Sequence, residues 1–142
     1  MTLTRDDTTR LLGATSMFRR VDPEGLAMIA ARTTELEVPA ERVIARQGEI
    51  GTGFFVIASG AVRVVRGGEV VAHLGPGDFF GELSILDGQP RIAQVVSTEP
   101  TVCLALASWD FEAVVAEQPS VALAILRELA GRLRVLTENP SH

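Results

Sequence analysis

The sequence predicts a mainly β fold with helices at both ends of the chain, on the basis of three observations. Between Thr34 and Ala107, short runs rich in β-branched and aromatic residues recur every 8–12 residues or so, each bounded by Gly, Pro, Ser or Asp. No helix-length pattern separates these runs, which argues against a parallel α/β sheet. Helical periodicity occurs only before and after them. Strands of this kind are typical of a sandwich, a barrel or a jelly roll.

Residues 1–33 are predicted to be helical. The segment Asp22-Pro23-Glu24 has the composition of a helix start, with a capping side chain, a proline in the first turn and an acid near the positive end of the helix dipole. Leu26, Ile29 and Ala30 then follow at helical spacing. We therefore expect a helix that begins at this proline.

Residues 34–107 are predicted to form the β-roll. Arg66-Gly67-Gly68-Glu69 is the expected hairpin turn, because consecutive glycines accept the positive φ values that tight hairpins need. The predicted strands lie in the runs ELEVPA, RVIARQG, GFFVIAS, AVRVVRG, EVVAHLG, IAQVVST and TVCLALA.

Residues 108–138 are predicted to form two helices. Ser108 is the candidate cap of the first, and the second follows Pro119. Glu128 and Arg132 are four residues apart and are expected to pair on the second helix. We see no linker, repeat or low-complexity segment and expect one domain over residues 1–142. The apolar stripe of the last helix consists of Ala122, Ile125, Leu126, Leu129, Leu133 and Leu136.

Charge and composition limit the function. The net charge is −5 and all thirteen basic residues are arginines. A nucleic-acid-binding protein usually has a basic face, so we expect no direct nucleic-acid partner. No apolar run is long enough to cross a bilayer, and the N-terminus lacks the apolar core of a secretory signal. We therefore expect a cytoplasmic protein without a membrane span.

Several residue types argue against catalysis. His73 and His142 are too few for a metal site, and Cys103 alone permits neither a disulfide nor an iron–sulfur cluster. No nucleophile with a partner base is visible, so we expect neither an enzyme nor a cofactor. Cys103, Trp109 and Phe111 are expected to pack as apolar residues.

The stretch GDFFGELSILDGQPRIAQ, residues 77–94, contains the candidate site. A short helix that starts at Gly81 presents free N–H groups to an anion, and Arg91, fixed by Pro90, can add a guanidinium. Glu82 would repel a phosphate unless the ligand also offers it a hydroxyl, as a ribose 2′-OH beside a cyclic phosphate does. The alternative is an ordinary ion pair between Glu82 and Arg91 at a surface turn.

Two segments resemble the cyclic nucleotide-binding domain family. Residues 81–86 and 90–93 are similar to its phosphate-binding cassette, and residues 46–49 and 54–62 resemble its glycine-punctuated strands. The resemblance extends from about residue 17 to residue 137. It implies a double-stranded β-helix, or jelly roll, flanked by N-terminal helices and two C-terminal helices.

The resemblance also implies roles for individual residues. Arg91 would bind the cyclic phosphate and Glu82 the ribose 2′-OH, while Gly81 lets the sugar approach. Backbone N–H groups around Leu83, Ser84 and Ile92 would complete the cradle, and Ser84 could add its hydroxyl. The whole set implied for ligand binding is Gly81, Glu82, Leu83, Ser84, Arg91, Ile92, Ala93, Leu136 and Thr137.

The identity of the base is less constrained. Members that favour cGMP often carry Thr or Ser where this sequence has Ile92, so the resemblance favours cAMP and leaves cGMP open. Gln94 departs from the usual Ser or Thr. Leu136 and Thr137 fall where relatives contact the adenine, although Leu136 could equally be a core residue and Thr137 part of a solvated helix end.

The predicted function is that of a regulatory module that binds a cyclic nucleotide and acts on an effector, either a partner chain or a domain outside this sequence. The last helix could also support a homodimer. The alternative is a protein-interaction domain on the same fold that does not respond to nucleotide.

Overall fold

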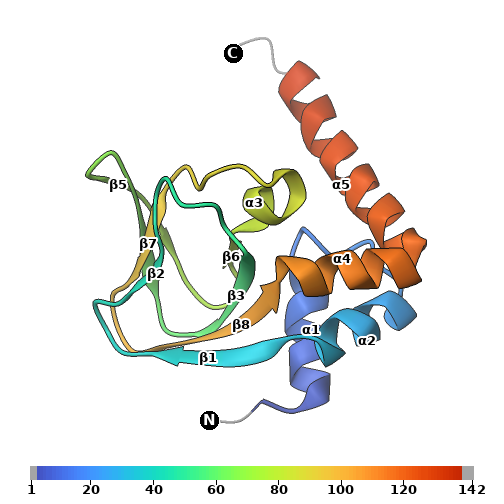
Figure 1. Ribbon diagram of the computed structural model, residues 1–142, viewed down its shortest axis with the longest axis horizontal. Coiled ribbons are helices and arrows are strands. Elements are labelled where there is room, and N and C mark those ends of the chain that lie inside the picture. Colours follow the sequence, from blue (N-terminus) through green and yellow to red (C-terminus); the bar gives the residue numbers. More distant parts are fainter. Residues whose placement is uncertain (1–2, 139–142) are drawn as a thin grey trace.

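The computed structural model describes residues 3–138 and confirms a mainly β fold between helical ends (Figure 1). At the N-terminus lie α1 (Arg5–Ala14) and α2 (Pro23–Ala31). The side chain of Asp22 accepts a hydrogen bond from the Gly25 N–H at 2.8 Å, so the predicted start of the second helix is confirmed. At the C-terminus lie α4 (Ser108–Glu117) and α5 (Pro119–Glu138).

Two four-stranded antiparallel sheets form the roll between these helices. One sheet has the order β1 (Thr34–Val38), β8 (Thr101–Ala107), β3 (Gly53–Ser59), β6 (Phe79–Phe80). The other has the order β2 (Val43–Ala45), β7 (Gln94–Ser97), β4 (Val62–Arg66), β5 (Glu69–Leu74). The short helix α3 (Glu82–Asp87) follows β6.

The predicted hairpin joins β4 to β5. Arg66 pairs with Glu69, and Gly67 and Gly68 have φ values of 60° and 83°. An L-residue with a side chain rarely adopts such values, which explains the two glycines at this turn.

The continuous apolar run of β3 follows from burial on both faces. Phe54 and Val56 pack in a cluster with the helices, whereas Ile57 packs in a second cluster inside the roll. The Phe54 ring lies 5.2 Å from Phe18 and 5.5 Å from Phe79, centroid to centroid. A strand covered on both faces has no polar side to alternate with, so it reads as all apolar.

Three details differ from the sequence expectations. The cap of α4 is Ala107, without a side-chain hydrogen bond, so Ser108 is the first helical residue and not the cap. Trp109 is 64% exposed and does not pack, whereas Phe111 is buried as expected. Cys103 is buried as expected, and this burial raises the pKa of its thiol to about 11. Strand β6 is too short to have been recognised from its pattern.

The predicted apolar stripe of α5 is only partly buried: Ile125 is buried and Leu129 is partly buried against the core, whereas the other leucines of the stripe are mostly exposed. Val121, Ala124 and Ile125 pack against the other helices, but Leu126, Leu133 and Leu136 are 60%, 64% and 57% exposed. Figure 1 shows the last turns of α5 pointing away from the roll. The stripe is therefore partly a surface feature and not a continuous core seam.

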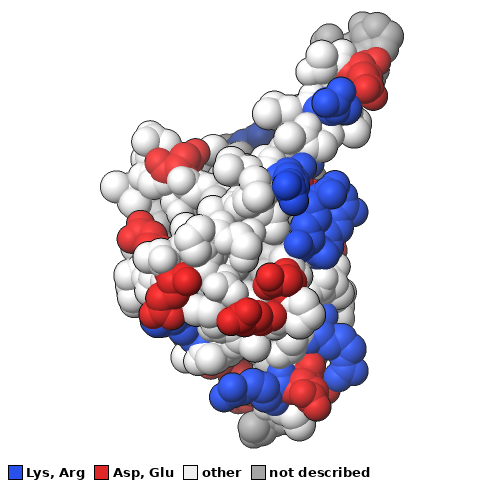
Figure 2. Space-filling view, turned by 90° about the vertical axis from the view of Figure 1, so that its right-hand side faces the viewer, with Lys and Arg blue, Asp and Glu red and all other residues white. Residues whose placement is uncertain are grey.

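A buried carboxylate fixes the base of α5. Glu128 pairs with Arg132 at 3.4 Å, as predicted, and also with Arg19 at 2.7 Å and Arg20 at 3.2 Å. Figure 2 shows basic side chains gathered at this base. Burial alone would raise the pKa of the Glu128 carboxyl, but hydrogen bonds from the arginines outweigh it and hold the pKa below its ordinary value.

We expect Glu128 to make stability depend on pH. Because its pKa is lower in the folded chain, the stabilisation is complete above the ordinary value of 4.5 and is lost as the pH falls through the folded value. Glu128→Gln should cost about 1–3 kcal/mol at pH 7 and progressively less as the pH falls below 4.5. Thermal unfolding across this range checks it, with Glu112→Gln as the exposed control. A difference between Glu128→Gln and wild type that does not shrink in acid would contradict this assignment.

Candidate functional site

A cavity of about 290 Å3 opens beside α3 and contains most of the expected site residues. Seven of the nine line it, namely Gly81, Glu82, Leu83, Ser84, Arg91, Ile92 and Ala93. Its other walls come from strands of the roll and from the loop that follows α3. The fold therefore brings the two halves of the stretch 77–94 to one place.

Helix α3 begins at a position that requires glycine. Gly81 has φ 90° and ψ 2°, and a Cβ on it would overlap the carbonyl oxygen of Gly53. Because the first N–H groups of a helix have no partner within it, the amides of Glu82, Leu83 and Ser84 are donors at the edge of the cavity. This end of the cavity is suited to an anion.

Arg91 is held by backbone contacts on both sides. Its N–H donates to the Glu49 carbonyl at 2.7 Å, and its own carbonyl accepts from the Gly48 N–H at 2.8 Å. Its Nη2 donates to the Gly53 carbonyl at 3.1 Å, and the guanidinium lies 5.9 Å from the ring centroid of Phe55. One nitrogen thus fixes the guanidinium while the others stay available to a ligand.

The guanidinium of Arg91 is partly buried and therefore partly desolvated. Burial lowers the pKa of Arg91, and the carboxylate of Glu49 opposes that shift. An arginine stays protonated in proteins even so, and a partly desolvated cation interacts more strongly with an anion than an exposed one does.

The ion-pair interpretation of Glu82 and Arg91 is wrong. Among the described residues no salt bridge joins these two side chains, although both line the same cavity. Within the same part of the chain no protein donor bonds the Glu82 carboxylate. The arrangement leaves one acid and one base in one cavity for separate partners.

Ser84 is already engaged within the cassette. It is 7% exposed, and its hydroxyl donates to the Gln89 carbonyl at 3.1 Å. The Ser84 hydroxyl was predicted as a possible donor to a phosphate, but it donates to the loop after α3 and helps to hold that loop in place. The Ser84 backbone N–H, near the start of α3, remains available as a donor at the cavity.

Leu136 and Thr137 do not line this cavity. Both lie on the exposed end of α5, where the Thr137 hydroxyl donates to the Leu133 carbonyl at 2.9 Å. The contacts of Glu128 hold the base of the helix on the turn between α1 and α2, so its end points away from the roll (Figure 1). The structure thus separates the expected base contacts from the cassette.

The loop that supports Arg91 was not predicted from the sequence. A Cβ on Gly51 would lie 2.7 Å from the Arg91 guanidinium carbon and 2.7 Å from the Ser84 Cβ. Ile50 pairs with Pro90 in an isolated bridge. The signal available was the pair of glycines in Gly51-Thr52-Gly53, but spacing alone does not say which distant side chain approaches them.

Fold and site together define a jelly-roll domain with a cavity that is lined by the first amides of a helix, a guanidinium and a carboxylate. The family model described as "Cyclic nucleotide-binding domain" matches residues 35–118. The chain belongs to the cyclic nucleotide-binding domain family, as its motifs predicted.

Two relatives of this chain are named after cyclic nucleotides. The chain is 37% identical to the cyclic AMP receptor protein of Thermus thermophilus, over 83% of this chain and 57% of that protein. It is 35% identical to a cyclic nucleotide-gated potassium channel of Mesorhizobium japonicum, over 80% of this chain and 31% of the channel. The chain thus spans between 31% and 57% of the length of these relatives.

Solved structures give the same fold. The N-terminal domain of a transcriptional regulator from Streptomyces coelicolor matches with a TM-score of 0.83 at 29% identity, covering 92% of this chain and 94% of that one. The regulatory domain of Toxoplasma gondii PKA, crystallised with cAMP, matches with a TM-score of 0.73 at 29% identity, covering 78% and 44%. The jelly-roll prediction is therefore confirmed.

Within the described residues, no helix is long and apolar enough to cross a membrane. In the same residues no three His, Cys, Asp or Glu side chains are grouped so that they could hold a metal ion.

Proposed function

We propose that this chain is a cytoplasmic cyclic nucleotide sensor that prefers cAMP and passes the signal to an effector protein or domain. The observation that carries the proposal is the unpaired acid and base in one cavity, Glu82 and Arg91. The phosphate would bind Arg91 and the free amides of α3, and the ribose 2′-OH would donate to Glu82. One relative named above is a cyclic AMP receptor protein, and the similar PKA regulatory domain was crystallised with cAMP. Both support the same class of ligand for this chain.

Preference for cAMP over cGMP rests on the residue after Arg91. Ile92 is 62% exposed at the cavity and has no side-chain donor or acceptor for a guanine. A site that forms no hydrogen bond with the groups that distinguish guanine from adenine gains no affinity from those groups. Binding at such a site also removes the hydrogen bonds that these groups form with water in the free ligand. We propose a preference on this ground and not an exclusion of cGMP.

Isothermal titration calorimetry with cAMP, cGMP, 5′-AMP and 2′-deoxy-cAMP tests the function. We expect cAMP to bind most tightly and 2′-deoxy-cAMP to bind about 10–100-fold more weakly, because it leaves Glu82 without its donor. In Glu82→Gln the difference between these two ligands should shrink, whereas Asp87→Asn, also at the cavity, should preserve it. No heat with any ligand would instead favour an interaction domain that does not respond to nucleotide.

Switching requires that the ligand bind one arrangement better than another. We propose that phosphate binding draws α3 inward, so that Ile85 and Leu86 repack against α4, and that the end of α5 then covers the base with Leu136 and Thr137. A ligand at a thousand times its dissociation constant supplies about 4 kcal/mol for this change. The contacts of Glu128 restrict the movement to the turns of α5 beyond Arg132.

The leucines of α5 suggest a homodimer as part of this proposal. Leu126, Leu129, Leu133 and Leu136 are spaced three, four and three residues apart, which is the pattern of a coiled-coil seam. Three of them, Leu126, Leu133 and Leu136, are mostly exposed, whereas Leu129 is partly buried against the core. Sedimentation of the calorimetry sample over a range of concentrations checks this, since a monomer at every concentration would remove the dimer from the proposal.

A further inference from the structure

A second cavity, of about 510 Å3, runs along the free edge of β2. Four consecutive residues, Val43–Arg46, line it. Because successive side chains of a strand point to opposite faces, a cavity that contacts all four runs along the edge of the strand. In its sheet β2 has one neighbour, β7, so its other edge carries backbone donors and acceptors without a strand partner.

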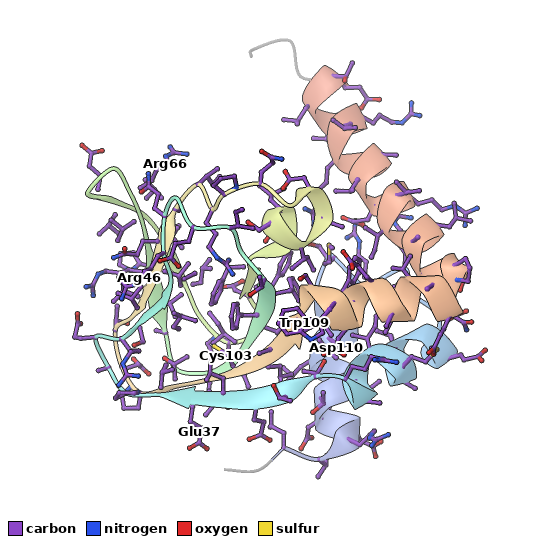
Figure 3. The ribbon with its side chains drawn as sticks, in the orientation of Figure 1. Glu37, Arg46, Arg66, Cys103, Trp109 and Asp110 are labelled. Atoms are coloured by element: carbon purple, nitrogen blue, oxygen red, sulfur yellow. The ribbon has the colours of Figure 1, made fainter. Side chains whose placement is uncertain are left out.

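Two large apolar side chains lie at this cavity and are mostly exposed. Ile50 is 65% exposed and Trp109 is 64% exposed, and both belong to its lining. Trp109 stands at the start of α4, and Arg46 follows β2 (Figure 3). A tryptophan exposed next to a cavity offers a large rigid surface for an apolar side chain of a partner.

The cavity also contains a cation with spare donors. The Arg46 side chain is 61% exposed, and its nearest acid is Glu49 at 4.0 Å. Arg32, on the opposite side, is engaged by Asp110 at 3.2 Å and Glu117 at 3.5 Å. Arg91 also lines this cavity but belongs to the proposed nucleotide site, so Arg46 is the guanidinium outside that site that can take a carboxylate in a forked contact.

We propose that this cavity binds an extended polypeptide segment of a partner protein. The segment adds a strand to the free edge of β2, places an apolar side chain between Ile50 and Trp109, and presents a carboxylate to Arg46. Strand addition of this kind derives affinity from main-chain hydrogen bonds and specificity from the pockets beside them. The proposal concerns a surface outside the nucleotide cavity and does not require nucleotide to be bound.

The two cavities are joined through Arg91. Both are lined by Ala45 and Arg91, and the loop that carries Ile50 holds the Arg91 backbone through the Glu49 carbonyl at 2.7 Å and the Gly48 N–H at 2.8 Å. A segment that shifts this loop therefore shifts the guanidinium as well. The resulting coupling between peptide and nucleotide rests on the proposed function, but peptide binding itself does not.

A phage-displayed library of random dodecapeptides, selected on the wild-type chain without nucleotide, tests the surface. We expect peptides that alternate β-branched residues with others and contain an acid, and that shift the emission of Trp109, the only tryptophan, to shorter wavelength. Ile50→Glu and Arg46→Glu should each weaken the selected peptides by about 30-fold. Val70→Glu, at a 51% exposed position on the other edge strand of the same sheet, should leave their affinity unchanged.

Three outcomes would overturn the proposal. One is that no peptide is enriched, and another is that the peptides bind Ile50→Glu and Arg46→Glu as well as wild type. The third is a dimer of this chain that Ile50→Glu dissociates while no peptide binds, because the surface would then be an interface between copies. Calorimetry with cAMP on the same protein keeps the hypotheses apart: peptide binding without nucleotide heat supports the surface and rejects the sensor.

Discussion

Replacing Arg91 with alanine is expected to weaken cAMP binding by about 30-fold or more. Removing one partner of a desolvated charge contact typically costs about 2–5 kcal/mol, and the phosphate would keep only the backbone amides of α3. Part of the loss also comes from the released Gly53 carbonyl, which accepts from Nη2 at 3.1 Å. Isothermal titration calorimetry of the variant against wild type measures the change directly.

Two further variants separate the role of the guanidinium from that of charge alone. Arg66→Ala, at the exposed β4–β5 hairpin, removes a charge of the same sign and should leave the affinity within about twofold of wild type. Arg91→Lys should bind between wild type and Arg91→Ala, because a lysine supplies the charge without the forked donor geometry. If Arg91→Ala bound as tightly as Arg66→Ala, Arg91 would have no role in ligand binding.

Gly81→Ala is expected to have the second large effect, on both stability and nucleotide affinity. Two costs add: the left-handed backbone costs about 1–2 kcal/mol for a residue with a side chain, and the overlap with the Gly53 carbonyl adds about 1–3 kcal/mol. Relief of that overlap moves the start of α3 away from β3. The amides of α3 and the guanidinium of Arg91 would then no longer converge on one anion. Thermal unfolding and calorimetry on the same sample measure the two effects.

Gly77→Ala is the matched control for this variant. Gly77 has the same φ of 90°, but a Cβ on it would meet nothing within 4 Å. It should therefore show the backbone cost alone and keep its nucleotide affinity. Equal losses of stability in the two variants would mean that the contact with Gly53 contributes nothing.

Local patterns were sufficient for most of the elements and for the seven candidate residues of the stretch 77–94 that line the cavity. The start at Asp22, the hairpin at Gly67 and Gly68, and the pairing of Glu128 with Arg132 are all short-range features, and each is confirmed. The stretch 77–94 contains the seven expected site residues that line the cavity, because α3 and Arg91 are joined by only a short loop. For features of this range, spacing along the chain is a good guide to spacing in the structure.

Features that depend on distant contacts were missed or misplaced. Trp109 was expected to pack and is exposed, since the neighbouring Phe111 takes the inward position at the start of α4. The leucines of α5 were expected to form one continuous stripe, but helical periodicity shows that residues share a face without showing what covers it. The support of Arg91 by Gly51 and Gly53 had no signal beyond two glycines.

The sequence by itself determined most of the strands and helices, a mainly β fold between helical ends, and the acid and base of the candidate site, and its resemblance to a known family added the jelly-roll class. The elements depend on periodicity, on turn residues and on short loops, all of which act over a few residues. Only the tertiary structure decided that Glu82 and Arg91 do not pair, that α5 points away from the cassette, and that a second cavity lies beside Trp109. The physical reason is that each of these depends on contacts across the fold. Glu128 meets Arg19 across 109 positions and Arg91 meets Gly53 across 38, and no local pattern encodes which side chains packing brings together.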